Sequence, residues 1–310
     1  MALDIRILTE VILPVVLAVA VGYSFGRYFE PELTSYTRIS IYVLIPSLLF
    51  DNLTSSALSL GEIGRLALLV LSVTVVLIII AWLVARPFSA LGRSTQSAMM
   101  LCVVLVNTGN LGLPIVTFAF GQESVPKAVV IVALNSIVTT TVGVFLSSRG
   151  RLSSSAALLT VFRTPLMWSM LAALAVNLFA IELPVAITRA THLVGQASIP
   201  ILLLLLGMQL ARASLREQIG QRWRALLMVV STRLIVSPLV AVLLTALLGF
   251  SGLERFALVV QLAMPTAVNA AVVAAEFGGD ATFVSSAVVV STLASLVTMT
   301  LLLSLIPFGT

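Results

Sequence analysis

Charged side chains are scarce in this chain of 310 residues. They make up 9% of it, whereas an average soluble domain carries about 25%. Hydrophobic residues account for 60%, and no stretch is long or polar enough to form a separate soluble domain. This composition excludes an ordinary soluble protein and indicates an integral membrane protein.

Cysteine and histidine are each present only once, as Cys102 and His192. A single cysteine excludes a disulfide within the chain, and the two residues cannot supply a Cys/His metal cage. An intramembrane enzyme would need a nucleophile next to a base, but these two residues lie on different predicted spans or at their edges, without a motif. We therefore predict no enzyme activity, no metal site and no cofactor.

What the chain does have is a series of apolar runs. A helix crosses the roughly 30 Å hydrocarbon core with about 20 apolar residues, so 310 residues have room for about ten such helices. The first run is too long for a signal-peptide core and lacks a clear cleavage site, so we expect it to be retained. The sequence predicts an all-α membrane protein with spans at 7–26, 37–53, 64–85, 95–120, 125–146, 165–181, 193–210, 225–248, 256–277 and 283–306.

The basic residues predict how these spans are oriented. Eleven of them lie in loops that follow odd-numbered spans, and five lie on the opposite side. Loops rich in Lys and Arg face the cytoplasm, which places both termini outside the cell. The net charge of +5 follows from this distribution, so no nucleic-acid partner is expected.

Two of the spans contain residues that weaken helices at their middles. The first interruption lies within Leu101–Pro114 and the second within Gln261–Asn269. Backbone groups freed at membrane depth must be buried in protein or line a wet cavity, because hydrocarbon offers them no partner. The interruptions therefore predict a solute path. Gly and Pro are also commoner in membrane helices in general, which is the simpler explanation for an isolated kink.

Proline positions suggest that the chain consists of two related halves. Three prolines of the first half match three of the second at similar offsets: Pro14 with Pro165, Pro46 with Pro200, and Pro114 with Pro265. A unit of five spans is odd, so its second copy must insert upside down, as in many secondary transporters. We predict a first five-helix repeat at 1–148, a short cytoplasmic linker at 149–164 and an inverted second repeat at 165–310.

Several segments of the chain resemble the auxin efflux carrier family. The most specific is Asn107–Ile115, with the sequence NTGNLGLPI. Further similar segments are Ile45–Phe50, Ile199–Pro200, Leu206–Leu210 and Pro265–Asp280. Plant members of this family have a long central hydrophilic loop, whereas here only about 147–163 joins the halves. The chain therefore looks like the compact bacterial form, which implies the inner membrane of a prokaryotic cell.

The resemblance also implies a fold, that of the bile-acid, auxin and arsenite transporter superfamily. In that fold the broken fourth and ninth spans cross. The first, second, sixth and seventh spans form a scaffold, commonly the surface of a homodimer, and the other spans form a moving transport domain. The substrates of the family are chiefly carboxylates.

The two interruptions predict an anion site without a basic side chain. The start of each second half-helix leaves N–H groups unpaired and carries roughly +0.5 of a charge. The expected substrate contacts are Asn107, Thr108, Asn110, Thr266, Asn269 and, from the scaffold, Asn52. The asparagines can equally act as helix caps. Pro114 and Pro265 are interpreted as the residues that break the helices, and Gly109 and Gly112 as positions where backbones approach closely.

Four polar side chains are candidates for charge balance or ion coupling. Arg233 lies inside a span, where it either pairs with the substrate carboxylate or holds the negative ends of the first half-helices. Asp51 and Glu276 are candidates for proton coupling or ordinary interfacial charges. Sodium-coupled relatives in the superfamily use acidic and amide groups at the crossing. Here Gln261 lies at the crossing without an acidic residue, so the resemblance makes sodium less expected than H⁺.

Together these features predict a secondary transporter for a small organic anion, either a monocarboxylate or dicarboxylate such as malonate, malate or an auxin-like acid. The transport domain would carry the site across the membrane, as an elevator does. Membrane lipids and a second copy of the chain are the other expected partners. The alternative is a membrane sensor or receptor that binds such anions without transporting them, and a passive channel is a further one.

Overall fold

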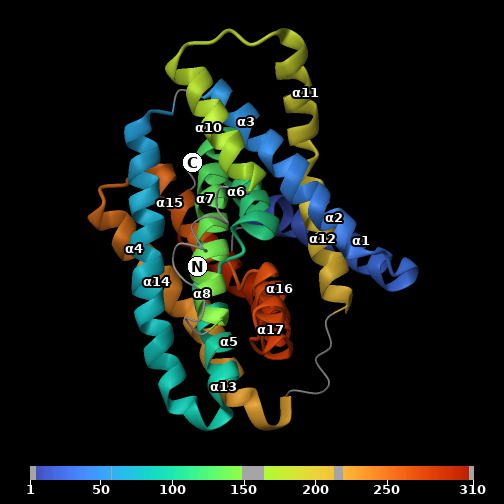
Figure 1. The fold of residues 1–310 in the computed structure, drawn as a ribbon, viewed down its shortest axis with the longest axis vertical. Helices are drawn as coiled ribbons and strands as arrows, with labels where there is room; N and C mark the ends of the chain where they lie inside the picture. The colour runs from blue at the N-terminus through green and yellow to red at the C-terminus, as the bar shows by residue number, and fades with distance from the viewer. Residues whose placement is uncertain (1–4, 57, 149–163, 213–218, 307–310) are drawn as a thin grey trace.

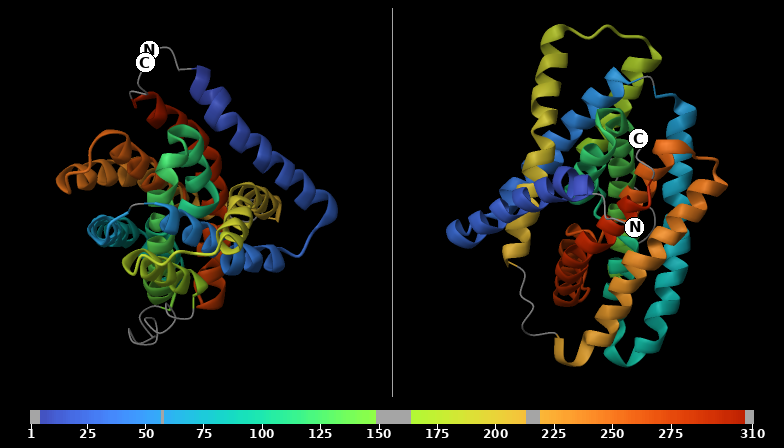
Figure 2. Two further views of the ribbon diagram at one scale, coloured as in Figure 1. Left: turned by 90° about the horizontal axis from the view of Figure 1, so that it is seen from above. Right: turned by 180° about the vertical axis from the view of Figure 1, so that it is seen from behind.

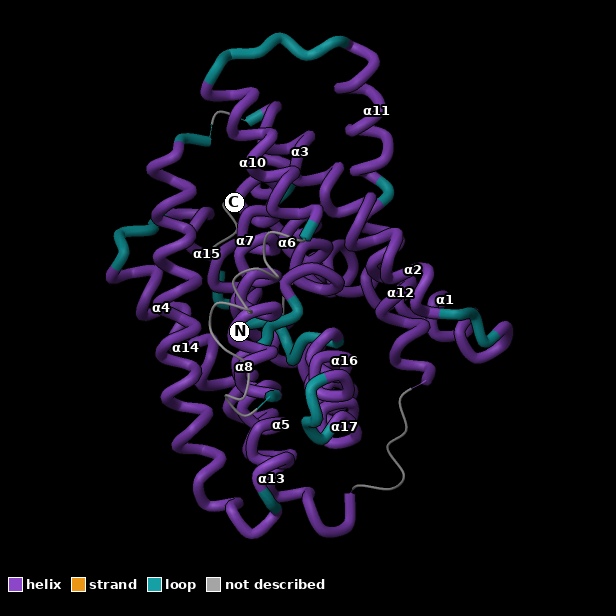
Figure 3. The backbone as a smooth tube through the Cα atoms, viewed as in Figure 1, coloured by secondary structure: helices purple, strands orange, loops and turns teal. Residues whose placement is uncertain are grey.

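The chain folds into helices in all the parts that its computed structural model describes, which are residues 5–56, 58–148, 164–212 and 219–306. Figure 1 shows the arrangement of these helices, and Figure 3 shows that the remaining described segments are loops. The predicted linker 149–164 lies outside the described residues except for Thr164.

Sixteen α-helices are described. Those of the first half are α1 (Leu13–Phe29), α2 (Leu33–Ile39), α3 (Ile45–Ser55), α4 (Leu60–Ala85), α5 (Arg93–Val104), α6 (Leu113–Phe120), α7 (Val125–Val138) and α8 (Val144–Ser147). Those of the second half are α10 (Pro165–Leu178), α11 (Val185–Gln196), α12 (Ser198–Arg212), α13 (Ile219–Ser231), α14 (Ser237–Leu247), α15 (Gly252–Leu262), α16 (Asn269–Glu276) and α17 (Ala281–Ser304).

Several of these helices join end to end into longer apolar rods. In the described residues, seven rods are long and apolar enough to cross a membrane: Ile7–Phe29, Leu33–Ser55, Leu60–Leu91, Gln122–Ser147, Val185–Arg212, Arg222–Leu247 and Ala281–Ser304. Many of their large apolar side chains face outward, such as Leu68 and Leu71 on α4, as expected for side chains that contact the hydrocarbon of a membrane. The predicted class, a helical membrane protein, is confirmed. The count of ten spans stays a prediction.

The rods contain π-helical turns, and most of these turns stand directly before a proline. Pro14, Pro46, Pro114 and Pro238 each follow such a turn by two residues. A proline has no N–H and its ring collides with the carbonyl of the preceding turn, and a π-helical turn locally rearranges that hydrogen bonding. Pro114 consequently lies inside the helix Thr108–Phe120. This corrects its interpretation as a residue that breaks the span.

Helices α1 and α12 pack along each other at glycines, on the side of the molecule away from α4 and α14 (Figures 1 and 2). A Cβ atom at Gly22 would lie 2.1 Å from the carbonyl oxygen of Leu204, and one at Gly207 would lie 2.1 Å from that of Val19. Small residues allow membrane helices to approach this closely. Helix α3 packs in turn on α10 and α11, where Asn177 of α10 donates to the carbonyl of Leu53 at 2.7 Å.

The remaining helices form a second group, in which α4, α5, α7 and α13–α17 contact one another. Lys127 lies 2.8 Å from Glu254 and 3.4 Å from Glu62, so an ion-pair cluster joins α7, α15 and α4. Asp280 caps α17 by accepting from the backbone N–H of Phe283 at 3.0 Å. Its carboxylate also accepts from Thr95 of α5 and Arg222 of α13. These side-chain contacts hold the second group together, and the sequence does not predict them.

Candidate functional site

The two predicted interruptions meet in the structure and pair through their main chains. The N–H of Asn107 donates to the carbonyl of Pro265 at 2.9 Å, and the N–H of Ala267 donates to the carbonyl of Leu105 at 2.9 Å. Val106 and Thr266 thereby form an isolated antiparallel bridge. Figure 3 shows these loop segments in the interior, between α5 and α6 and before α16. Pairing satisfies backbone groups that neither helix can satisfy at this depth.

The chain turns sharply at Asn107 before the helix resumes at Thr108. With φ −82° and ψ 60°, Asn107 is the centre of an inverse γ-turn, in which the N–H of Thr108 donates to the carbonyl of Val106 at 2.9 Å. The N–H groups of Asn107 and Thr108 therefore already have acceptors. The predicted role of the helix start in binding an anion therefore falls to the N–H groups of the following residues, beginning with Gly109.

Arg233 holds the other ends of the interruptions. It is completely buried, and its guanidinium donates to the carbonyls of Val103 at 2.8 Å, Met264 at 2.9 Å and Leu262. Val103 is in the last turn of α5 and Leu262 is the last residue of α15. Each helix end carries about −0.5 of a charge, so the two together balance the arginine. Two roles are predicted for Arg233: pairing with a substrate carboxylate, or holding the negative ends of the first half-helices. The contacts in the structure are those of the second role.

Two further predicted residues support the backbone around the interruptions. Gln261 donates to the carbonyl of Ala128 at 2.9 Å and is 3.4 Å from that of Thr108. The hydroxyl of Thr266 donates to the carbonyl of Cys102 at 2.8 Å, and Thr266 does not line the cavity described next. In this structure the hydroxyl of Thr266 is therefore used within the protein, and its role as a substrate contact stays a prediction.

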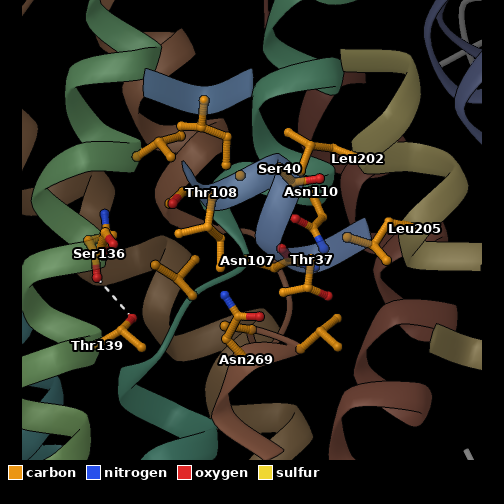
Figure 4. Close-up of a pocket in the computed structure, with 18 of the residues that line it drawn as sticks. Thr37, Ser40, Asn107, Thr108, Asn110, Ser136, Thr139, Leu202, Leu205 and Asn269 are labelled. Carbon is orange, nitrogen blue, oxygen red and sulfur yellow. Dashed lines mark hydrogen bonds between the residues drawn. The ribbon is translucent and has the colours of Figure 1, made fainter. Parts of the chain in front are cut away.

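A cavity of about 90 Å³ lies beside the paired interruptions, between the two groups of helices. Figure 4 shows Asn107 and Asn269 facing the same space, with Ser136 and Thr139 on one side and Thr37 and Leu205 on the other. The polar side chains that line the cavity are those of Thr37, Ser40, Asn107, Thr108, Asn110, Asn135, Ser136, Thr139 and Asn269.

Asn107 has the clearest signature of a ligand contact. The residue is 5% exposed, it lines the cavity, and its Nδ2 atom has no hydrogen-bond partner among the described residues. An amide donor buried without an acceptor costs about 1–3 kcal/mol. A ligand that brings an acceptor oxygen into the cavity would recover this free energy.

The structure places some of the other predicted contacts at the cavity and one away from it. Thr108, Asn110 and Asn269 line the cavity. The side chain of Asn110 also lies 3.4 Å from Gln209 of α12, which links the interrupted span to the first group of helices. Asn52 does not line the cavity. Its amide donates to the carbonyl of Leu48 in its own helix at 2.9 Å.

Of the predicted glycine and coupling residues, Gly109 lines the cavity and the others do not. Gly112 allows a close approach, since a Cβ atom there would lie 3.1 Å from the side chain of Met264. Asp51 is paired with His192 at 3.0 Å, and Glu276 is exposed at the end of α16. Neither acid lines the cavity.

Sequence reasoning missed the polar residues on the other walls. Asn135, Ser136 and Thr139 are spaced so that they share one face of α7 and the turn that follows it. Thr37 and Ser40 come from α2 and the π-helical turn after it. The signal that would have found them is a polar stripe at helical spacing within an apolar span.

Comparison with known proteins agrees with these features. The family model Mem_trans, described as membrane transport protein, matches residues 7–157 and 147–303. An uncharacterized transporter of Methanothermobacter thermautotrophicus is 29% identical over 297 residues, which cover 94% of this chain and 96% of the relative. The uncharacterized transporter MJ1031 of Methanocaldococcus jannaschii is 25% identical over 301 residues, with the same coverage of both chains. The chain belongs to this membrane transport family, which is the family of the auxin efflux carriers.

Proposed function

We propose that this protein is a secondary active transporter that moves a small organic anion across the cell membrane of a prokaryote. The observation that carries the proposal is the unpaired, buried Nδ2 donor of Asn107 in a cavity beside two paired helix interruptions. Membership of a membrane transport family supports transport as the activity. In this proposal the chain forms ten spans as two inverted repeats, with both termini outside the cell.

The chemistry of the cavity favours an anion. Among the described residues that line it, none carries a carboxylate, and the polar groups are amides and hydroxyls. Two half-helices begin at its edge, at Thr108 and Asn269, and each helix start contributes about +0.5 of a charge. Neutral donors and helix starts together can bind a carboxylate without a basic residue.

The location of the cavity supports an elevator mechanism. Thr37, Leu202 and Leu205 come from the group that contains α1, α2, α3 and α10–α12, whereas Asn107 and Ser136 come from the other group. A ligand held mainly by the second group of helices would face one side of the membrane and then the other, as the second group slides along the first group. We assign the first group as the scaffold, and as the surface through which two copies form a homodimer.

The acidic side chains bear on which ion drives transport. Asp51 and Glu276 stay the candidates for proton coupling, although both lie outside the cavity. Gln261 uses its amide nitrogen on protein carbonyls, and no acidic residue lines the cavity among those described. We therefore propose H⁺ rather than Na⁺ as the coupling ion.

Removing the amide of Asn107 tests the proposed site. We expect Asn107→Ala to lower the affinity for a transported carboxylate by about tenfold or more, because hydrogen bonds to charged groups contribute about 1.5–3 kcal/mol. Uptake of labelled dicarboxylates into proteoliposomes measures the effect, with equilibrium binding as a second readout. Thr191→Ala is the control, since Thr191 on α11 does not line the cavity and its hydroxyl bonds only to its own helix.

Full uptake by the Asn107→Ala protein would remove this site assignment. Carboxylate binding by the unmodified protein without any flux would instead favour a sensor or receptor. Neither binding nor flux with any small carboxylate would overturn the proposed substrate class.

The size of the cavity predicts which carboxylates bind. About 90 Å³ holds a few water molecules or an anion of few heavy atoms, whereas drug-sized ligands occupy about 300–1,000 Å³. We therefore expect malonate to raise the melting temperature of the purified protein and indole-3-acetate to raise it less at equal concentration. A larger shift with the indole acid would contradict this order.

A further inference from the structure

A long apolar crevice separates the two groups of helices on the side of the molecule where α1 and α12 lie. Its first part encloses about 350 Å³ between α2 and α12 on one wall and α16 and α17 on the other. Its second part encloses about 420 Å³ between α1, α12 and α17. Leu210 and Val289 line both parts, so the two parts adjoin, and together we call them the lateral crevice.

The walls of the lateral crevice are apolar and partly exposed. Val272 on α16 is 53% exposed and Leu293 on α17 is 55% exposed, so the crevice opens sideways from the protein. In a membrane, such an opening faces the acyl chains of lipids rather than water. The walls alone give little preference between one lipid and another, because lipid tails are as apolar as the side chains that they meet.

One end of the lateral crevice carries positive charge. Arg38 of α2 and Arg212 of α12 line its first part, and within the part of the chain that the structure describes neither forms an ion pair with a carboxylate. Arg212 is positioned by donating to the carbonyls of Glu30 and Pro31 after α1. Both arginines lie in loops or helix ends that the charge distribution places at the cytoplasmic face.

An apolar channel with two arginines at its membrane-surface end matches the shape of an anionic phospholipid. Basic pockets between membrane helices on the cytoplasmic side bind such headgroups. A small soluble anion would meet apolar walls here, whereas the cavity beside Asn107 offers it amides and hydroxyls. We infer that an anionic phospholipid occupies the lateral crevice, with its phosphate at Arg38 and Arg212 and an acyl chain along α17.

Lipid selectivity of the purified protein tests this inference. We expect native mass spectrometry to show more bound phosphatidylglycerol than phosphatidylcholine with the same chains. Arg38→Gln should reduce that preference about fivefold, since one basic residue near an anionic headgroup strengthens binding by roughly a factor of five. Arg38 is exposed, so the variant is expected to fold. Arg27→Gln is the control, because Arg27 is exposed near the end of α1 and does not line the crevice.

A second variant tests the apolar part. Val272→Trp adds a large side chain at an exposed position of the wall and should reduce binding of both lipids, whatever their headgroup. Equal binding of the two lipids by the unmodified protein, or an unchanged preference in Arg38→Gln, would overturn the inference. Displacement of phosphatidylglycerol by glycerol phosphate would also overturn it, because a soluble anion would then be the occupant.

Discussion

An Arg233→Met variant is expected to lose most of its folded stability, although the substitution removes a charge from the interior of a membrane protein. The guanidinium donates to three carbonyls, those of Val103, Leu262 and Met264. Methionine has a similar length but no donor. Each carbonyl left buried without a partner costs about 1–3 kcal/mol, and the ends of α5 and α15 would face each other with like partial charges.

The expected decrease in melting temperature is about 10 °C or more, measured on detergent-purified protein. The melting temperature of Arg233→Lys should lie between those of the unmodified protein and Arg233→Met. An ammonium group can donate, but it lacks the planar guanidinium that reaches several acceptors at once. Arg224→Gln is the matched control, since it removes an exposed arginine from α13, the helix that leads to Arg233. Unchanged stability of Arg233→Met would show that the paired interruptions do not depend on this side chain.

The addition of a single methyl group at Gly207 is expected to be almost as damaging. The new Cβ atom of Gly207→Ala would lie 2.1 Å from the carbonyl oxygen of Val19 and 2.6 Å from the backbone nitrogen of Tyr23. Both neighbours are main-chain atoms, so α1 and α12 would have to move apart along their length. Overpacking of this kind costs about 1–3 kcal/mol or more, and here it also widens the contact that joins the first and seventh predicted spans.

Gly64 provides a matched control for this substitution. It lies in α4, and a Cβ atom there would meet nothing within 4 Å. Gly64→Ala should therefore be neutral or slightly stabilising, because alanine is favoured over glycine in a helix by about 0.8–1.0 kcal/mol. Size-exclusion chromatography and thermal unfolding of both variants measure the difference. Equal behaviour of the two proteins would contradict the close packing of α1 on α12.

The sequence is sufficient to locate the interruptions and to place Asn107 at the first of them. Helix-weakening residues at mid-span have few explanations in hydrocarbon, so the pattern at Leu101–Pro114 and Gln261–Asn269 was informative. The same pattern does not predict which residue breaks the helix and which lies within it. Pro114 matches Pro265 in sequence position, yet Pro114 lies in a helix and Pro265 lies in the interruption. A proline can be accommodated by a π-helical turn as well as by a break.

The direction in which a side chain points could not be predicted at these positions. Thr266 and Asn269 are close in sequence, but the hydroxyl of Thr266 is used by the carbonyl of Cys102 and Asn269 faces the cavity. In irregular backbone the spacing of residues does not determine the direction of their side chains, as it does in a helix or a strand. The cavity walls formed by Thr37 and Ser136, and the ion pairs of Lys127 and Asp280, depend on contacts between distant segments, which no local pattern encodes.

The joint between the two interruptions is made of peptide groups. Since the bonds from Asn107 to Pro265 and from Ala267 to Leu105 use only N–H and C=O, they do not depend on the side chains at Thr37, Ser136 or Thr139 across the cavity. Those wall positions can be exchanged without loosening the frame. A single architecture of this kind can therefore be adapted to solutes of different shape while the way it moves is inherited unchanged.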